Sequence, residues 1–93
     1  MTHAARLRMV KTAIRSPYAW PGGYPLYLVM GDVGALSLTS ARACWREIVS
    51  SVLGRDRNSG WHPAAVEINW EDGDLICDHS GERIESAYAE PEA

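Results

Sequence analysis

A run of apolar residues with the period of an α-helix is the feature that most constrains how this chain can fold. Between positions 41 and 53, apolar residues recur at the i, i+3, i+4 and i+7 spacing that places them on one helix face. They are Ala41, Cys44, Trp45, Ile48, Val49, Val52 and Leu53. Thr39 or Ser40 can cap the beginning of this helix, and Gly54 can close its end. The pattern predicts one main amphipathic helix over about residues 40–53, with Ser51 on its polar face.

Apolar segments on both sides of this helix predict β-strands. Residues 24–30 (YPLYLVM) are short, aromatic and apolar, which is typical of a buried strand. Residues 64–70 alternate, with Val66, Ile68 and Trp70 on one face, which predicts a half-buried strand. Asp72-Gly73 is a hairpin turn signal, so residues 75–77 would return as a strand and residues 84–88 would pair once more.

These elements together predict one α+β domain over residues 1–93. The main helix would pack on an antiparallel sheet through the side chains of Leu26, Leu28, Val66, Ile68 and Trp70. Residues 1–15 predict a short basic helix, since Leu7, Val10 and Ile14 follow helical spacing, although a strand fits the segment 6–10 almost as well. Residues 89–93 predict a frayed acidic tail. In a chain of 93 residues the core is thin, and a metal or a second copy in a homodimer often supports it.

The net charge of −3 hides a strong asymmetry along the chain. Residues 1–31 contain no acid and carry four basic residues: Arg6, Arg8, Lys11 and Arg15. Residues 67–93 carry nine acids against one arginine, Arg83. Such runs are usually solvated, or the two ends lie close together and neutralise each other. The functional alternatives are an acidic face for a basic partner and a basic segment for phosphate groups.

The sequence carries no pattern typical of export or of membrane insertion. Arg and Lys interrupt the first 16 residues every few positions, so they contain no secretory apolar core. There is no apolar run of about 18 residues. The two cysteines are too few for a disulfide framework. We therefore expect a cytoplasmic protein without a membrane partner, in the host cell if a phage encodes it.

Two short turns have the spacing of a zinc site but lack most of its ligands. Ser37 and Ser40 in the first turn, and Cys77 and Ser80 in the second, stand where two C-x-x-C pairs would supply four thiolates. A serine hydroxyl does not replace a thiolate as a structural zinc ligand. The sequence therefore predicts a degenerate site without metal, held by hydrogen bonds. A site rebuilt from Cys44, His62, Cys77 and His79 is the alternative that would bind zinc.

Three segments resemble a group of small uncharacterised phage and bacterial proteins: SPYAWPGGYPLYLVMGD, INWEDGDLICDH and GERIESAY. The resemblance covers roughly residues 15–90. In that group the two turns read C-x-x-C and C-D-H-C, which implies a zinc ribbon with ligands at positions 37, 40, 77 and 80. This chain departs from the pattern at three of these four positions. The resemblance thus implies a zinc-ribbon-like fold with a degenerate metal site, and it implies no biochemical activity.

The aromatic residues around position 20 have packing and binding interpretations. Tyr18, Trp20, Tyr24 and Tyr27 would mostly pack in the core and its loops. Exposed members would anchor a protein partner, or stack on bases while the basic segment contacts phosphates. The acidic second half of the chain argues against a nucleic-acid face over the whole protein.

The leading hypothesis is a non-enzymatic phage or prophage protein that binds a protein partner, for example as an anti-CRISPR-like inhibitor of a host defence complex. The partner-binding residues would be Tyr18, Trp20, Tyr24, Glu71, Asp72, Asp74, Glu82 and Glu85. The first alternative is a nucleic-acid-binding ribbon that uses Arg6, Arg8, Lys11 and Arg15. The second is a thiol or metal enzyme, which is weak because no third group is evident to orient a pair such as Cys77 and His79.

Overall fold

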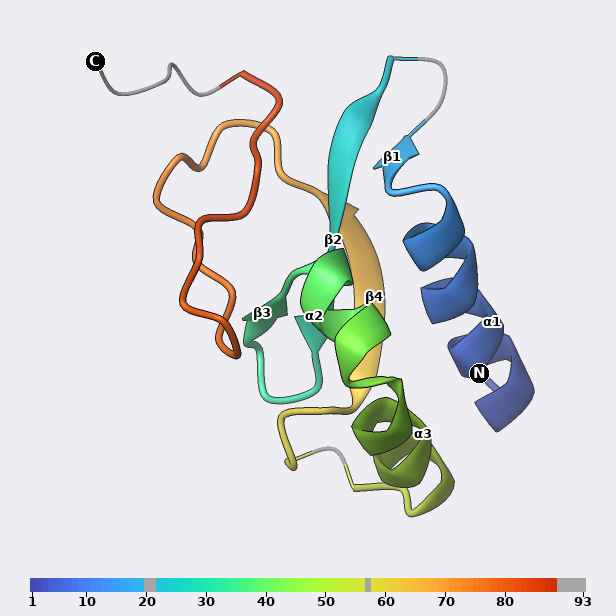
Figure 1. The fold of residues 1–93 in the computed structure, drawn as a ribbon. Helices are drawn as coiled ribbons and strands as arrows, with labels where there is room; N and C mark the ends of the chain where they lie inside the picture. Colours follow the sequence, from blue (N-terminus) through green and yellow to red (C-terminus); the bar gives the residue numbers. More distant parts are fainter. Residues whose placement is uncertain (20–21, 57, 89–93) are drawn as a thin grey trace.

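The structure is a computed structural model that describes residues 1–19, 22–56 and 58–88. Within these residues the chain forms helices and a small antiparallel sheet, which confirms the predicted mixed α+β class (Figure 1). The helices are α1 (His3–Arg15), α2 (Leu38–Ala43) and α3 (Trp45–Leu53). The strands are β1 (Tyr18–Ala19), β2 (Tyr24–Met30), β3 (Ala35–Leu36) and β4 (Pro63–Ile68). Two earlier predictions, the partner contact at Trp20 and the frayed tail at 89–93, lie outside the described residues.

Strand β2 organises the sheet. It pairs antiparallel with β1 at its beginning, with β3 towards its end and with β4 along most of its length. Leu28 lies opposite Leu36 of β3 and Val66 of β4, and both leucines are almost completely buried. The predicted strand at 24–30 is confirmed with the same bounds. The predicted strand at 64–70 forms but ends at Ile68.

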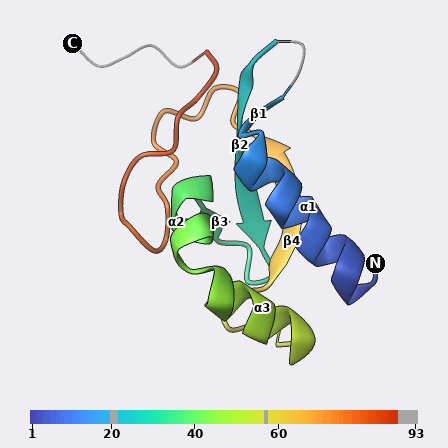
Figure 2. The same ribbon diagram turned by 45° about the vertical axis from the view of Figure 1, so that its right-hand side comes forward.

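The basic segment at the beginning of the chain is a helix rather than a strand. The Thr2 hydroxyl accepts a hydrogen bond from the Ala5 N–H and caps α1. Helix α1 packs on β4 and β2 and also contacts α2 and α3 (Figure 2). Val10 and Ala13 face the core, where Val10 meets Leu28 and Ile48 in one apolar cluster. The predicted helical spacing of the segment is therefore confirmed.

The predicted single helix at 40–53 is wrong in one respect, because the chain forms two helices that break at Cys44. The backbone there adopts φ −110° and ψ 32°, and the Cys44 N–H closes α2 by donating to the Ser40 carbonyl. Ser37, rather than Thr39 or Ser40, caps α2 by accepting the Ser40 N–H. Gly54 ends α3 as predicted.

The break changes which residues face the core. Ala41, Ile48 and Val52 are completely buried, as predicted. Leu53 is exposed, whereas Ser51 is buried and donates a hydrogen bond of 2.6 Å to the Asp56 carbonyl. The sequence predicted a buried Leu53 and an exposed Ser51, and the structure has the opposite. Ser51 can be buried because the loop after α3 folds back onto it and supplies a polar partner.

The second half of the predicted sheet does not form. Residues 75–77 and 82–84 approach each other through an isolated bridge between Ile76 and Arg83 and through the hydrogen bond from the Ile84 N–H to the Leu75 carbonyl, and no regular strand forms there. Trp70, expected in the core, is exposed, and Asn69 is buried in its place. The Asn69 amide donates to the carbonyls of Asp72, Ile84 and Glu85, and its oxygen accepts the Asp72 N–H. These four hydrogen bonds turn the chain at position 69 and end the strand alternation.

The acidic segment 71–88 lies across the sheet from the basic helix α1 (Figures 1 and 2). The charge separation along the sequence is therefore also a separation in space. We correct the interpretation in which the two ends neutralise each other: the acidic residues of the segment are exposed to solvent.

Candidate functional site

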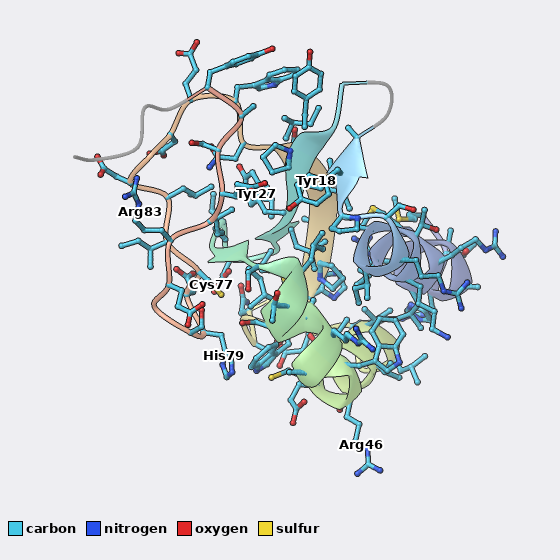
Figure 3. The ribbon with its side chains drawn as sticks, turned by 45° about the horizontal axis from the view of Figure 1, so that its top comes forward. Tyr18, Tyr27, Arg46, Cys77, His79 and Arg83 are labelled. Atoms are coloured by element: carbon cyan, nitrogen blue, oxygen red, sulfur yellow. The ribbon has the colours of Figure 1, made fainter. Side chains whose placement is uncertain are left out.

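The structure brings the two serine-containing turns together around Cys77 at the end of β3. The Ser37 N–H donates to Cys77 Sγ at 3.3 Å, and Cys77 Sγ lies 3.4 Å from Ser40 Oγ. The Cys77 side chain has no exposed surface. Figure 3 shows Cys77 and His79 in the C-terminal segment beside α2. Residues 40 positions apart in the chain thus share one small polar cluster.

The second turn is closed by its own backbone. The Gly81 N–H donates to the Cys77 carbonyl, and the Cys77 N–H donates to the Glu82 carbonyl. The hydroxyl of Ser80 accepts the Glu82 N–H at 3.2 Å. Gly81 has φ 74°, a left-handed conformation that glycine adopts without steric penalty. The Asp78 N–H donates to the Ala35 carbonyl and fastens the turn to β3.

The environment of Cys77 favours the thiolate. Desolvation of the buried sulfur raises its pKa, but hydrogen bonds from Ser37, Ser40 and Ser80 outweigh that effect and lower the pKa of Cys77 from 9.0 to about 6. We therefore expect Cys77 to be largely ionised at neutral pH, with hydroxyl and backbone N–H groups around the sulfur. Such a sulfur is a good ligand and a stabilised charge, but its burial denies it access to a substrate.

The alternative zinc site from Cys44, His62, Cys77 and His79 is not assembled. Cys44 Sγ lies 3.5 Å from His79 Nε2, while Cys77 faces the serines of α2. His62 lines a separate hollow beside Arg6 and Arg55. Within residues 1–19, 22–56 and 58–88, no group of three or more His, Cys, Asp or Glu side chains is placed to hold a metal ion. The absence of bound metal itself remains a prediction.

An aromatic cluster lies at the end of the sheet where β2 begins. Tyr24, Trp70 and Tyr88 form it: the Tyr24 and Trp70 rings have centroids 4.6 Å apart, and Trp70 and Tyr88 stack at 6.1 Å with an interplanar angle of 11°. The Tyr88 hydroxyl donates to the Tyr24 hydroxyl at 3.2 Å, which raises the pKa of Tyr88. Trp70 and Tyr88 are 46% and 59% exposed. We refer to these three residues as the aromatic cluster.

The predicted partner residues Tyr18, Glu71, Asp72, Asp74, Glu82 and Glu85, and the aromatic residue Tyr27, lie outside the aromatic cluster. Tyr18 is exposed, and its pKa is raised by the Glu85 carboxylate, through charge and then through a hydrogen bond. Tyr27 is half-buried, and burial followed by the charges of Glu67 and Asp72 raises its pKa. All five predicted acids are exposed: Glu71, Asp72, Asp74, Glu82 and Glu85.

Sequence reasoning missed the two residues that complete the aromatic cluster. It assigned Trp70 to the core and gave Tyr88 no role, because a strand alternation that continued beyond Ile68 would have buried Trp70. The one signal that points to them is Asn69, which fits the polar face of the alternation but can turn the chain by accepting and donating hydrogen bonds.

The four predicted nucleic-acid contacts do not form one surface. Arg6 turns inward, and its Nη1 donates to the Pro63 carbonyl at 2.6 Å. Lys11 Nζ lies 5.4 Å from the centroid of a Trp45 ring. Lys11 and Arg15 share a hollow with Arg42, whereas Arg8 lines a different groove of α1. The basic residues therefore divide among three places.

Comparisons with protein families, with curated proteins and with solved structures found no match to this chain. The class of protein therefore rests on its fold and on the arrangement of its side chains. In the described part of the chain, no helix has the length and apolar character needed to cross a membrane.

Proposed function

We propose that this protein is a non-enzymatic binding protein whose partner is a protein with a basic surface. The observation that carries the proposal is the aromatic cluster, in which Tyr24, Trp70 and Tyr88 contact one another while Trp70 and Tyr88 remain largely exposed. Tyr and Trp dominate the binding energy of protein interfaces because they bury large areas with few rotatable bonds.

The three rings of the aromatic cluster contact one another without a partner. Stacking of Trp70 on Tyr88 and the hydroxyl contact between Tyr88 and Tyr24 restrict the rings. Restricted rings lose less side-chain entropy on association, so more of their buried area contributes to affinity. This supports a role in recognition rather than in packing alone.

The charge beside the cluster indicates the chemistry of the partner. Glu71 and Asp72 directly follow Trp70, and both are exposed. Exposed carboxylates around an apolar anchor attract a basic partner and increase the association rate. This attraction becomes weaker as the salt concentration rises. In the most specific form of the proposal, the partner is a basic cleft of a host defence complex that normally holds nucleic acid, and the protein acts in the cytoplasm as an anti-CRISPR-like inhibitor.

The site chemistry supports a non-enzymatic role. The thiol of Cys44 lies 3.5 Å from His79 Nε2, so a nucleophile and a base are close together. The other described side chain beside the imidazole is Trp61, and the two ring centroids are 5.2 Å apart. An indole edge does not orient a general base in the way that a carboxylate or an amide does. The thiolate-forming Cys77 is buried.

The test is a binding measurement with Trp70→Ala against Leu53→Ala. Leu53 is an exposed apolar residue on α3, outside the aromatic cluster, so it serves as the matched control. After a partner has been captured from host lysate and identified, we expect Trp70→Ala to weaken its affinity by about 30-fold and Leu53→Ala to leave it unchanged.

Equal affinities of the two variants would overturn the proposal, and so would an acidic partner. Light scattering tests whether a second copy of this chain covers the aromatic cluster instead. If the protein is a dimer and Trp70→Ala converts it to a monomer, the cluster serves self-association and the proposal of a different partner is rejected.

Nucleic-acid binding is the second candidate, supported by the hollow that Lys11, Arg15 and Arg42 line beside Trp45. Basic side chains next to an aromatic ring are the arrangement that binds single strands. This reading predicts an affinity that falls steeply with salt and with Arg42→Gln. Salt-independent or absent binding would reject it.

A further inference from the structure

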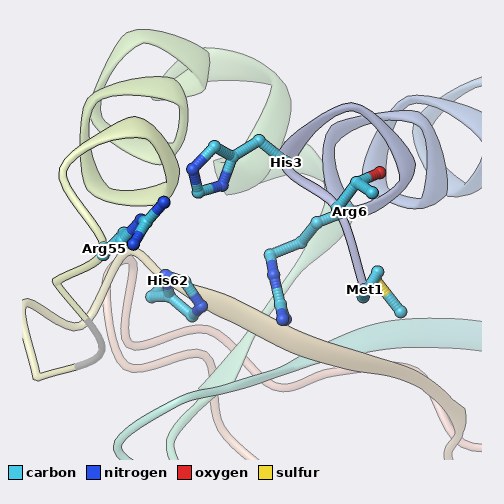
Figure 4. A pocket seen from close by; sticks show the side chains of 6 residues that line it. Met1, His3, Arg6, Arg55 and His62 are labelled. Atoms are coloured by element: carbon cyan, nitrogen blue, oxygen red, sulfur yellow. The ribbon is translucent and has the colours of Figure 1, made fainter.

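A hollow of about 420 Å³ opens where the beginning of α1 meets the loop after α3 and the entry to β4. Its lining is Met1, Thr2, His3, Arg6, Arg55 and His62. Figure 4 shows the side chains of His3, Arg6, Arg55 and His62 around the same space. The described lining thus combines two guanidinium groups and two imidazoles, and it contains no carboxylate. Its volume lies in the range of about 300–1,000 Å³ that small-molecule sites occupy.

Two of these groups are fixed by the fold. Arg6 donates through Nη1 to the Pro63 carbonyl, which holds its guanidinium at the entry to β4. A guanidinium has five N–H donors, so this bond leaves others available to a ligand. His62 is only 5% exposed and brings an imidazole to the wall of the hollow. The positive end of the α1 peptide dipoles is directed to the same region.

Arg55 is held at the hollow in a conformation that its side chain disfavours. Its φ is 58°, in the left-handed region where a Cβ meets the following carbonyl oxygen. Glycine or asparagine would occupy this position with less strain. The left-handed backbone closes α3, because the Arg55 N–H donates to the Val52 carbonyl and the Asp56 N–H donates to the Ser51 carbonyl. The position that terminates α3 thus also places an exposed guanidinium at the hollow.

We propose that this hollow binds the phosphate group of a small phosphorylated molecule. Arginine matches phosphate through paired N–H donors, and a phosphate at this place would lie among the guanidinium groups of Arg6 and Arg55 and the imidazole of His62. A lining without carboxylates leaves an anion unopposed. The space beyond one phosphate accommodates a sugar-sized group.

Calorimetric and NMR titrations at constant ionic strength test the proposal with three probes: orthophosphate, ribose 5-phosphate and ribose. We expect saturable binding of the two phosphates at one site, with shifts of the Arg6, Arg55 and His62 resonances, and no binding of ribose. Orthophosphate that binds as tightly as ribose 5-phosphate would identify the free anion as the ligand, and tighter binding of the ester would identify a phosphate monoester.

Arg55→Asn is the decisive variant, because asparagine tolerates the left-handed backbone and carries no charge. We expect it to weaken phosphate binding by about tenfold or more, with an unchanged or higher melting temperature. Arg55→Gly should behave in the same way. The control is Arg46→Gln, because Arg46 is exposed on α3 and Figure 3 shows its side chain directed away from the molecule.

Three results would overturn the proposal: binding that does not saturate, equal losses in Arg55→Asn and Arg46→Gln, or an oligonucleotide without a terminal phosphate that competes as well as ribose 5-phosphate. The last result would make the hollow part of a general polyanion surface. A loss of binding in Arg55→Asn with retained melting temperature supports the site independently of the aromatic cluster.

Discussion

Two parts of this small protein are stabilised in different ways: residues 1–68, called the first half below, and segment 69–88, called the second half. The first half contributes an apolar core, in which Val10, Leu28, Ile48 and Val52 are completely buried between α1, α3 and the sheet. Segment 69–88 has hardly any regular structure. It adds Cys77 and Ile84 to the apolar core, and the hydrogen bonds of Asn69 and Cys77 set its path. In the first half, stability scales with apolar area removed from water. In the second, a small apolar contribution from Ile84 and Cys77 is joined by a few buried hydrogen bonds, whose loss leaves polar groups without partners.

The difference explains why a loosely structured segment can present an ordered surface. Asn69 and Cys77 each bind the backbone of sequence-distant residues, so they fix the path of the chain without a sheet. Trp70 and Tyr88 remain free to form the aromatic cluster at the surface. Polar centres therefore do here what strand pairing does in the first half, and each centre can be removed by a single substitution.

Conversion of the polar centre at Cys77 to a metal centre should give the largest effect. In the variant Ser37→Cys, Ser40→Cys, Ser80→Cys, four thiolates would stand where the present chain has one. We expect about one zinc ion per chain and a stabilisation on the order of 10 kcal/mol at saturating metal. Elemental analysis and urea unfolding with and without chelator measure both.

The control for this variant is the unaltered chain purified without chelator, for which we expect no zinc. Stoichiometric zinc in the unaltered chain would show that the serine cluster is not degenerate. A variant that folds but takes up no metal would show that the four positions do not have tetrahedral geometry.

Removal of Asn69 tests whether the second half is a separate cooperative unit. Asn69→Ala leaves three carbonyls and one N–H without their side-chain partner, and we expect a loss of about 3 kcal/mol. Leu28→Ala in the apolar core should remove about 4 kcal/mol. Urea unfolding gives the two free energies, and hydrogen exchange gives their distribution along the chain.

The comparison predicts different exchange patterns for these variants. Asn69→Ala should accelerate exchange in residues 69–88 and leave β2 protected, whereas Leu28→Ala should accelerate both. Identical patterns would mean that the chain unfolds as one unit and that the contrast between its halves has no energetic meaning.

The Cys77 thiolate predicts a smaller, pH-dependent effect. Because the pKa of Cys77 is lower in the folded chain than its ordinary value of 9.0, its contribution to stability is fully present above pH 9 and is lost as pH falls through about 6. Between pH 6 and 7.5 we expect the free energy of unfolding to rise by about 2 kcal/mol from this residue. Urea unfolding across this range measures it.

Cys77→Ser should flatten this pH dependence, and Cys44→Ser should preserve it. If Cys77→Ser retains the full rise between pH 6 and 7.5, another group is responsible and the sulfur is not ionised in the folded protein. Iodoacetamide labelling adds a check, because burial of Cys77 should make it slow to react in spite of its lowered pKa.

Local patterns in the sequence determined the α+β class, strand β2 and the helical character of residues 38–53. They favoured helix α1 while leaving a strand open over residues 6–10. Each follows from spacing or from a cap, as in the end of α3 at Gly54. The spacing of Ser37, Ser40 and Cys77 also indicated a shared cluster, and the folded chain forms it. The individual hydrogen bonds of the cluster are visible only in the structure.

Only the tertiary structure decided the rest, because those features depend on partners far along the chain. Asn69 turns inward since the carbonyls of Ile84 and Glu85 are there to accept its amide, and Trp70 consequently turns outward. The break at Cys44 separates α2 from α3, and the left-handed Arg55 closes α3 together with the hydrogen bond from the Asp56 N–H to the Ser51 carbonyl. The periodicity of a helix or strand shows which of its faces is apolar. The residues that pack against that face are determined only when the whole chain folds.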